Sequence, residues 1–338
     1  MDHVFTDFYS VKTFYYHQSK SFNKLKFMEN KVLGIHHITA IAGNAKRNYE
    51  FYTTVLGLRM VKKTVNFDDP GTYHFYFGDE IGSPGTILTF FPWEGITTGK
   101  TGPGMATEIG YAVPEGSFDF WKRRFEQYSV KVTGSGERFG EQYLSFEDPD
   151  GLKLALIVPK QADSRKPWET QDVKANVATK GFHSITLTLR NVKATAAVLT
   201  DIFDYTLQAQ DGNRYRYTTN AIENASVVDL IEATADVNSV GGSGTIHHVA
   251  FRVKDEAILM HFRDKVVKKG FNITQKIDRN YFFSLYFREP GGVLFELATD
   301  NPGFSVDEPV NELGKNLKLP AQYEADRAAI EKVLPALV

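Results

Sequence analysis

Cysteine is absent from the 338 residues of this chain. Its absence excludes disulfide frameworks, thiolate metal sites, iron–sulfur clusters and cysteine nucleophiles. Long apolar runs are absent as well, since no stretch approaches the roughly 20 apolar residues of a membrane-spanning helix. Residues 1–30 lack the continuous apolar segment of a secretory signal, and we interpret them as an N-terminal extension. We therefore expect a cytoplasmic protein without a membrane partner.

A strong excess of one charge is also missing, because 39 basic and 41 acidic side chains leave a net charge of −2. This balance provides no electrostatic footprint for nucleic acid or an anionic membrane. No strand-like run is followed by GxGxxG at a helix start, and a phosphate loop is missing, so NAD is not expected. The chain does contain 42% hydrophobic and 13% aromatic residues, enough for a large core in two domains.

An internal repeat is the strongest signal in the sequence. Each copy begins with a strand-like run, continues as a helical pattern and ends in three short strand-like runs, which predicts a βαβββ module. The four copies begin GIHHITAIAGN, ATEIGYAVPEG, GFHSITLTLRN and TIHHVAFRVKD. Aligning these runs places four residues at equivalent positions: His37, Glu108, Ser184 and His248.

The repeat predicts an α+β fold of four βαβββ modules in two tandem domains. Residues 31–160 would form the first domain, and residues 181–300 the second. The polar, proline-containing residues 161–180 would link them, and residues 301–338 would form a partly helical C-terminal extension. A homo-oligomer is left open.

Strand alternation separates the neighbouring histidines of the repeat. In strict alternation, His37 and His248 lie on the polar face that lines a cleft. The same alternation places His36, His183 and His247 on the apolar face that packs against helices.

Glu296 is a lone carboxylate inside the apolar run VLFEL. An unpaired buried carboxylate is costly, so this one should have a cation or a donor as its partner. Two histidines and one carboxylate, His37, His248 and Glu296, fit the ligand set of a non-haem Fe(II) site. Mn(II) is the natural competing metal, whereas Zn(II) normally prefers four-coordinate arrangements.

Aligning SPGTILTFF with EPGGVLFEL places Phe90 opposite Glu296, and the second module has Ala155 at this position. The third module has no matching landmark. Modules one and four together can therefore build one site, and modules two and three are expected to build none. His183 lies next to Ser184 and leaves a ligand from the third module open.

This pattern resembles the vicinal oxygen chelate superfamily of glyoxalases, bleomycin resistance proteins and extradiol dioxygenases. The segments LGIHHITAIAG, IHHVAFRV and EPGGVLFELAT resemble, in particular, bacterial hydroquinone-type ring-cleaving dioxygenases. The resemblance implies cup-shaped, partly open barrel-like sheets. It also implies Fe(II)-dependent insertion of O₂ into a small hydroquinone-like or catechol-like aromatic diol. Hydroquinone-type enzymes take their ligands from the first and last modules, whereas catechol-type enzymes use a histidine of the third.

The resemblance also implies active-site roles for Tyr286 and Arg279, which match residues of the hydroquinone-type enzymes. Arg279 would pair with a phenolate or a carboxylate, and Tyr286 would donate a hydrogen bond. His36 or His247 could carry protons near the metal. Three aromatic residues are candidates for the apolar walls: Phe90, Phe282 and Trp93.

Two other functions are open to this fold. A glyoxalase-type isomerase or lyase with Ni(II) or Zn(II) would want a second carboxylate where Phe90 is aligned. A metal-free small-molecule-binding resistance protein would have no reason to keep two histidines and a glutamate.

Overall fold

Two curled β-sheets dominate the computed structural model, which describes residues 30–235 and 237–337. The predicted extension, residues 1–30, lies outside the described residues except for its last one. The first sheet contains β1 (Ile35–Ala42), β2 (Arg59–Asn66), β3 (Asp69–Gly78), β4 (Ile87–Pro92), β13 (Thr245–Val253), β14 (Ile277–Asp278), β15 (Phe282–Arg288) and β16 (Leu294–Pro302). The second contains β5 (Met105–Ala112), β6 (Val132–Arg138), β7 (Glu141–Glu147), β8 (Lys153–Val158), β9 (Phe182–Leu189), β10 (Thr206–Asp211), β11 (Arg214–Thr218) and β12 (Val227–Glu232).

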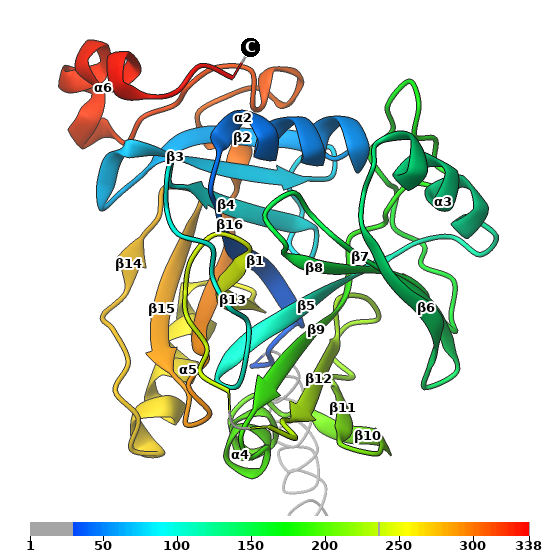
Figure 1. The fold of residues 1–338 in the computed structure, drawn as a ribbon. Helices are drawn as coiled ribbons and strands as arrows, with labels where there is room; N and C mark the ends of the chain where they lie inside the picture. Colours follow the sequence, from blue (N-terminus) through cyan, green and yellow to red (C-terminus); the bar gives the residue numbers. More distant parts are fainter. Residues whose placement is uncertain (1–29, 236, 338) are drawn as a thin grey trace, which may run out of the picture. The chain divides into compact units, whose positions relative to one another are not determined.

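Each sheet joins one module from the first half of the sequence with one module from the second half. The strand orders are β14-β15-β16-β13-β1-β4-β3-β2 and β10-β11-β12-β9-β5-β8-β7-β6. Modules one and four form the first sheet, modules two and three form the second, and each sheet curls into a half-barrel (Figure 1). The α+β prediction of four βαβββ modules is confirmed, and the domain boundaries proposed above stay a prediction.

The helices begin and end close to the residues that the sequence indicates. They are α2 (Ala45–Glu50), which continues as the π-helical turn η1 (Phe51–Val55), α3 (Phe118–Gln127), α4 (Lys193–Asp201) and α5 (Glu256–Lys268). Asn44 and Asp255 cap α2 and α5 by accepting hydrogen bonds from backbone N–H groups two or three residues into the helix. Ser117 precedes α3 without a side-chain capping bond. Among the described residues, no helix is both long and apolar enough to span a membrane.

Residues after β16 extend over the first sheet. They form the short helices η2 (Phe304–Val306), η3 (Val310–Glu312), η4 (Ala321–Asp326) and α6 (Arg327–Val333). The buried Lys62 ammonium of β2 holds this segment through Asp307 and Glu308, at 2.6 and 2.5 Å. Phe304 and Leu313 complete an apolar cluster with residues of the sheet, namely Val61, Tyr76, Ile87, Ala250, Tyr281, Phe282 and Ala298.

A β-bulge interrupts the first strand of every module at the same position. Where β1 pairs with β13, Ile35 faces Phe251 and His37 faces Ala250, so His36 is an extra residue. The extra residue of β13 is His247 by the same criterion. The pairing of β5 with β9 has Thr107 and His183 as its extra residues. A bulge places two successive side chains on the same face of a strand. His36, His183 and His247 therefore do not face the helices, and the prediction from strict alternation was wrong for all three.

Candidate metal centre

Three side chains from adjacent strands converge on the inner face of the first sheet. His37 comes from β1, His248 from β13 and Glu296 from β16. Oε2 of Glu296 lies 3.1 Å from Nε2 of His37 and 2.8 Å from Nε2 of His248, and the two Nε2 atoms are 3.4 Å apart. All three residues are buried. The structure thus brings together the three residues of the predicted ligand set.

The Glu296 carboxyl is fully buried, and its charge depends on its neighbours. Burial alone would raise the pKa of this carboxyl, but His37 and His248 hold the pKa well below its usual range. Its Oε1 accepts a hydrogen bond of 2.5 Å from the hydroxyl of Ser284. Its Oε2 has no hydrogen-bond partner among the described residues. A buried anionic oxygen without a donor calls for a cation.

The hydrogen bonds behind His37 determine which of its nitrogens is free. Nε2 of His36 lies 3.0 Å from the carbonyl oxygen of Thr299, which only accepts, so this nitrogen carries the proton. Burial, and next His37, lower the pKa of His36 well below its usual range, so the ring is neutral and its Nδ1 is an acceptor. Nδ1 of His37, 2.9 Å away, must donate to it. Nε2 of His37 is therefore the ring nitrogen that faces Glu296 and is left for a metal.

His247 stands behind His248 in the same way. Their Nδ1 atoms are 2.8 Å apart, although His247 is largely exposed. Partial burial and the neighbouring His248 lower the pKa of His247 to about 4, so it is neutral at pH 7. The donor set is two imidazole nitrogens and one carboxylate oxygen, whose ligand atoms all lie within 4.8 Å of one another. This set fits a divalent metal of intermediate softness.

The counterpart of Glu296 in the first module is Thr89, and the predicted alignment with Phe90 was wrong by one residue. Ala250, two residues after His248, pairs with Glu296, and Thr39, two residues after His37, pairs with Thr89. The turn before β16 contains one residue more than the turn before β4, which the alignment on Pro-Gly did not reveal. Phe90 instead packs in the core, with its ring 4.6 Å from that of Tyr52.

In the second sheet, the acidic side chain at the position equivalent to Glu296 forms ion pairs with basic side chains of the same sheet. Asp229 is the counterpart of Glu296, because it pairs with Thr186, two residues after Ser184. The guanidinium of Arg216 bridges Asp229 and Glu141. His183 lies here as well, with Nε2 3.1 Å from Glu141, and not beside the three candidate ligands. An arginine thus occupies the place that a metal would need, and among the described residues only the first sheet brings such a group of ligands together.

Comparison with known proteins agrees with the fold and the centre. Residues 34–156 and 181–297 match the Glyoxalase/Bleomycin resistance protein/Dioxygenase superfamily. The chain belongs to this superfamily. It is 45% identical to MhqO of Bacillus subtilis, provisionally named a ring-cleaving dioxygenase, over 91% of this chain and 97% of MhqO. It is 35% identical to the chlorohydroquinone/hydroquinone 1,2-dioxygenase of Sphingobium indicum, over 88% of this chain and 94% of that enzyme.

A solved relative supports the same grouping. A Bacillus subtilis crystal structure, provisionally named a dioxygenase, superposes with a TM-score of 0.87 at 44% identity, covering 91% of this chain and 98% of the other. The predicted superfamily is confirmed, and so is the prediction of an oxidoreductase of the ring-cleaving dioxygenase class.

Tyr286 and Arg279 lie beside the ligands of this superfamily member. Tyr286 pairs with Glu296 across β15 and β16, and its ring centroid is 5.6 Å from that of His248. Burial, and next Glu296, raise the pKa of Tyr286, so the phenol keeps its proton. The Arg279 guanidinium lies 5.4 Å from the centroid of the Tyr286 ring. Its nearest acidic partner is the exposed Asp68, at 3.9 Å.

A group that the sequence did not single out extends the centre along β3 and β4. Nε2 of His74 lies 3.0 Å from the hydroxyl of Thr89, and the Tyr76 hydroxyl lies 3.0 Å from Nδ1 of His74. The Thr89 hydroxyl is 2.9 Å from that of Thr39. Period-two alternation in TYHFYFG would have found His74 and Tyr76, since Phe75 and Phe77 between them are core residues.

The aromatic residues predicted to form apolar walls lie at different distances from the candidate ligands. Phe282 lies over His37, with ring centroids 4.8 Å apart. Trp93 donates its indole N–H to Asp69 and contacts Phe91, whose ring lies 4.4 Å from that of His74. Phe90 faces the core and does not reach the centre. Phe91, one residue later, faces it.

Proposed function

We propose that this chain is an Fe(II)-dependent ring-cleaving dioxygenase that inserts O₂ into a hydroquinone-like or catechol-like aromatic diol. The observation that carries the proposal is the buried convergence of His37, His248 and Glu296, whose ligand atoms lie within 4.8 Å of one another. The names of the relatives support the reaction class, and the hydroquinone dioxygenase among them supports hydroquinone as the preferred ring.

The three side chains would hold the metal through two Nε2 atoms and one carboxylate oxygen. When bound, Fe(II) supplies the electron transfer that allows O₂ to react with an aromatic diol. Mn(II) is the competing metal for the same donors. Ser284 orients the carboxylate by its bond to Oε1, and His36 and His247 position the two ligand rings.

Other side chains would bind and orient the substrate. The Arg279 guanidinium lies over the Phe67 and Tyr286 rings and 3.9 Å from the exposed Asp68 carboxylate, so it is available to pair with a phenolate oxygen. The protonated Tyr286 phenol is placed to donate a hydrogen bond beside the ligands. The rings of Phe282 and Phe91 supply apolar surface for the aromatic ring and keep water away.

Oxygen consumption tests the proposal directly. The protein is purified without oxygen, reconstituted with Fe(II), and offered hydroquinone and catechol separately. Uptake with hydroquinone and little with catechol is expected. His248→Ala should abolish both uptake and metal retention, whereas the exposed His261→Ala on α5 should change neither.

The remaining outcomes point to the other functions of the fold. Tightly held metal without oxygen uptake would favour a glyoxalase-type isomerase or lyase, although Thr89 supplies no second carboxylate. A protein that neither retains metal nor consumes oxygen would be better explained as a metal-free binding protein. Preference for catechol would contradict the hydroquinone assignment, because His183 lies in the other sheet.

A further inference from the structure

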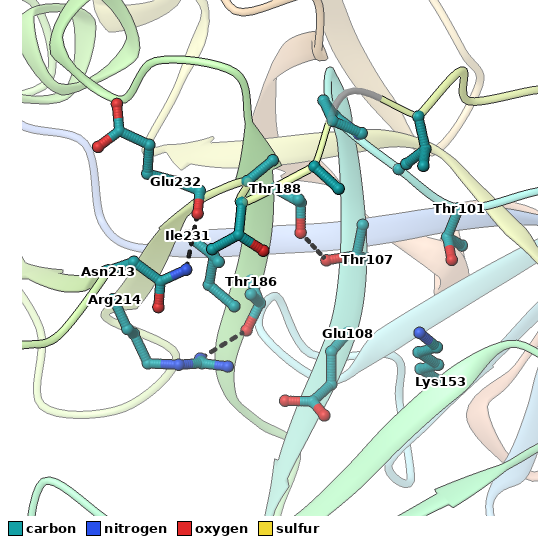
Figure 2. A pocket seen from close by; sticks show the side chains of 16 residues that line it. Thr101, Thr107, Glu108, Lys153, Thr186, Thr188, Asn213, Arg214, Ile231 and Glu232 are labelled. Carbon is teal, nitrogen blue, oxygen red and sulfur yellow. Dashed lines mark hydrogen bonds between the residues drawn. The ribbon is translucent and has the colours of Figure 1, made fainter.

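A cavity of about 370 Å³ opens on the second sheet, away from the three candidate ligands. It lies between β5, β8, β9, β11 and the end of β12, and residues 101–103, 233–235 and 237 contribute to its rim (Figure 2). Its volume is within the range of small-molecule sites, about 300–1,000 Å³. None of the residues proposed above for ring cleavage lines it.

The cavity is lined by residues at repeat positions equivalent to those of the metal centre, but the residue types differ. Thr107 and Glu108 form the bulge of β5, at the positions that His36 and His37 occupy in β1. Thr186, a counterpart of Thr39 and Ala250, faces the same cavity. The inner face that brings the candidate ligands together in one half-barrel is therefore open to a different ligand in the other.

One uncompensated positive charge faces this cavity. The Glu108 carboxylate is paired with Arg138, and the Arg214 guanidinium is paired with Asp229. Lys153, at the start of β8, has no ion-pair partner among the described residues. Glu232 also lines the cavity, but its carboxylate points away from the other labelled side chains in Figure 2. Among the described residues that line the cavity, the exposed Lys153 ammonium is the positive charge left without an acidic partner.

Threonine hydroxyl groups line the same cavity. The hydroxyls of Thr107 and Thr188 are 2.8 Å apart, so one of the two protons remains available to a ligand. The hydroxyl of Thr186 accepts from Arg214 at 3.2 Å and keeps its own proton as a donor. Thr101 and Thr234 line the rim. Donors of this kind match oxygen atoms of a hydroxyl or carboxylate group.

The rim is held by backbone pairing. Lys100 and Val240 exchange two backbone hydrogen bonds of 2.8 and 2.9 Å, and the Ser239 hydroxyl donates to the carbonyl of Pro103 at 3.0 Å. The walls are strands of one sheet. A cavity with such walls is largely formed before a ligand arrives, which lowers the cost of binding.

We propose that this cavity binds a small carboxylate that also carries a hydroxyl group, with Lys153 pairing with the carboxylate. The threonine hydroxyls would bind the remaining oxygen atoms, and Glu108 would accept a hydrogen bond from the ligand's hydroxyl. The site does not depend on the ring-cleavage function, because its residues belong to the other sheet.

Ligand binding to the full chain, freed of metal, tests this site. The probe is 4-hydroxybenzoate, and 4-hydroxybenzamide is its uncharged match; calorimetry or ligand-observed NMR measures both. The wild type should bind the acid at least about tenfold more tightly than the amide, because an ammonium–carboxylate bond is charge-assisted. Lys153→Met should remove that difference, and Lys122→Met, which changes an exposed lysine of α3 outside the cavity, should preserve it.

A second variant separates this site from the metal centre. Glu296→Ala should bind 4-hydroxybenzoate as the wild type does, even if ring cleavage proves to be wrong. Thermal unfolding checks that each variant folds, which is expected because Lys153 is exposed. Equal binding by Lys153→Met and the wild type would overturn the proposal. So would loss of binding in Glu296→Ala alone, or no binding of the acid by the wild type.

Discussion

The rings of His36 and His37 lie on the same face of β1, with their Nδ1 atoms 2.9 Å apart. They do so because His36 is the extra residue of a β-bulge between the paired residues Ile35 and His37. The same relationship recurs at His247 and His248. Each candidate ligand is thus supported by the residue that precedes it in the chain. Sequence neighbours that ordinarily face opposite sides of a strand here act together.

We expect His36→Ala to weaken metal binding by about 10- to 100-fold, the usual effect of removing a hydrogen-bond partner of a ligand. The variant removes the acceptor that fixes the proton on Nδ1 of His37, so Nε2 no longer presents its lone pair in one orientation. Competition with a chelator of known affinity measures the change. His261→Ala, on the exposed face of α5, is the control. Unchanged affinity in His36→Ala would show that the hydrogen bonds from His37 to His36 and from His36 to the Thr299 carbonyl are not needed.

The register of β4 can be tested with a matched pair of variants. Phe90→Glu would bury an unpaired carboxylate in the core beside Tyr52, and we expect it to lose several kcal/mol or fail to fold. Thr89→Glu would place the same carboxylate beside the candidate ligands, where a bound metal compensates it. This variant should fold with metal, unfold at a lower temperature without it, and be more dependent on metal than the wild type. The reverse order of stabilities would restore the alignment of Phe90 with Glu296.

The repeat was sufficient to predict the modules and the three residues that converge. Strict alternation could not reveal a bulge, because an extra residue leaves no mark in a run such as GIHHITAIAG. The alignment on Pro-Gly failed by one residue for a related reason, since turn length varies independently of strand register. Asp229, the counterpart of Glu296 in the third module, has no such landmark and emerged only from strand pairing.

Metal removal should lower the thermal stability of the wild type and leave Glu296→Ala unaffected. A metal present at about 100 times its dissociation constant stabilises the native state by about 2.7 kcal/mol, because it binds the folded chain and not the unfolded one. Thermal unfolding before and after treatment with a chelator measures this difference. Equal shifts in the two proteins would mean that the metal binds elsewhere.

Lys62→Met should loosen the segment that follows β16. Lys62 is fully buried and pairs with Asp307 and Glu308, and removing it leaves the buried Glu308 carboxylate without a cation. Breaking a buried pair from one side costs about 3–5 kcal/mol. Chemical denaturation measures the total, and hydrogen exchange at residues 303–314 locates it. Lys62→Met combined with Glu308→Leu should recover much of the loss, and no recovery would argue against the uncompensated charge as its cause.

Asp148 should make the protein less stable as the pH rises from about 4 to about 7. Burial, and to a smaller extent Asp150, raises the pKa of Asp148 to about 7, whereas an unfolded chain has an aspartate pKa of about 4. Between these values the folded state binds the extra proton. The contribution of Asp148 to stability is therefore fully present below pH 4, declines by at most about 1.4 kcal/mol per pH unit, and is lost above pH 7.

Asp148→Asn isolates this contribution, because an amide oxygen can still accept from the backbone N–H groups of Asp150 and Leu152. The free energy of unfolding of the variant minus that of the wild type should rise with pH between 4 and 7 and then level off. Asp201→Asn provides the opposite sign, since the hydrogen bond from Lys269 lowers the pKa of that exposed carboxyl. Denaturant unfolding of the metal-free proteins at several pH values measures all three. A flat difference for Asp148→Asn would mean that the pKa of this carboxyl is the same in the folded and the unfolded protein.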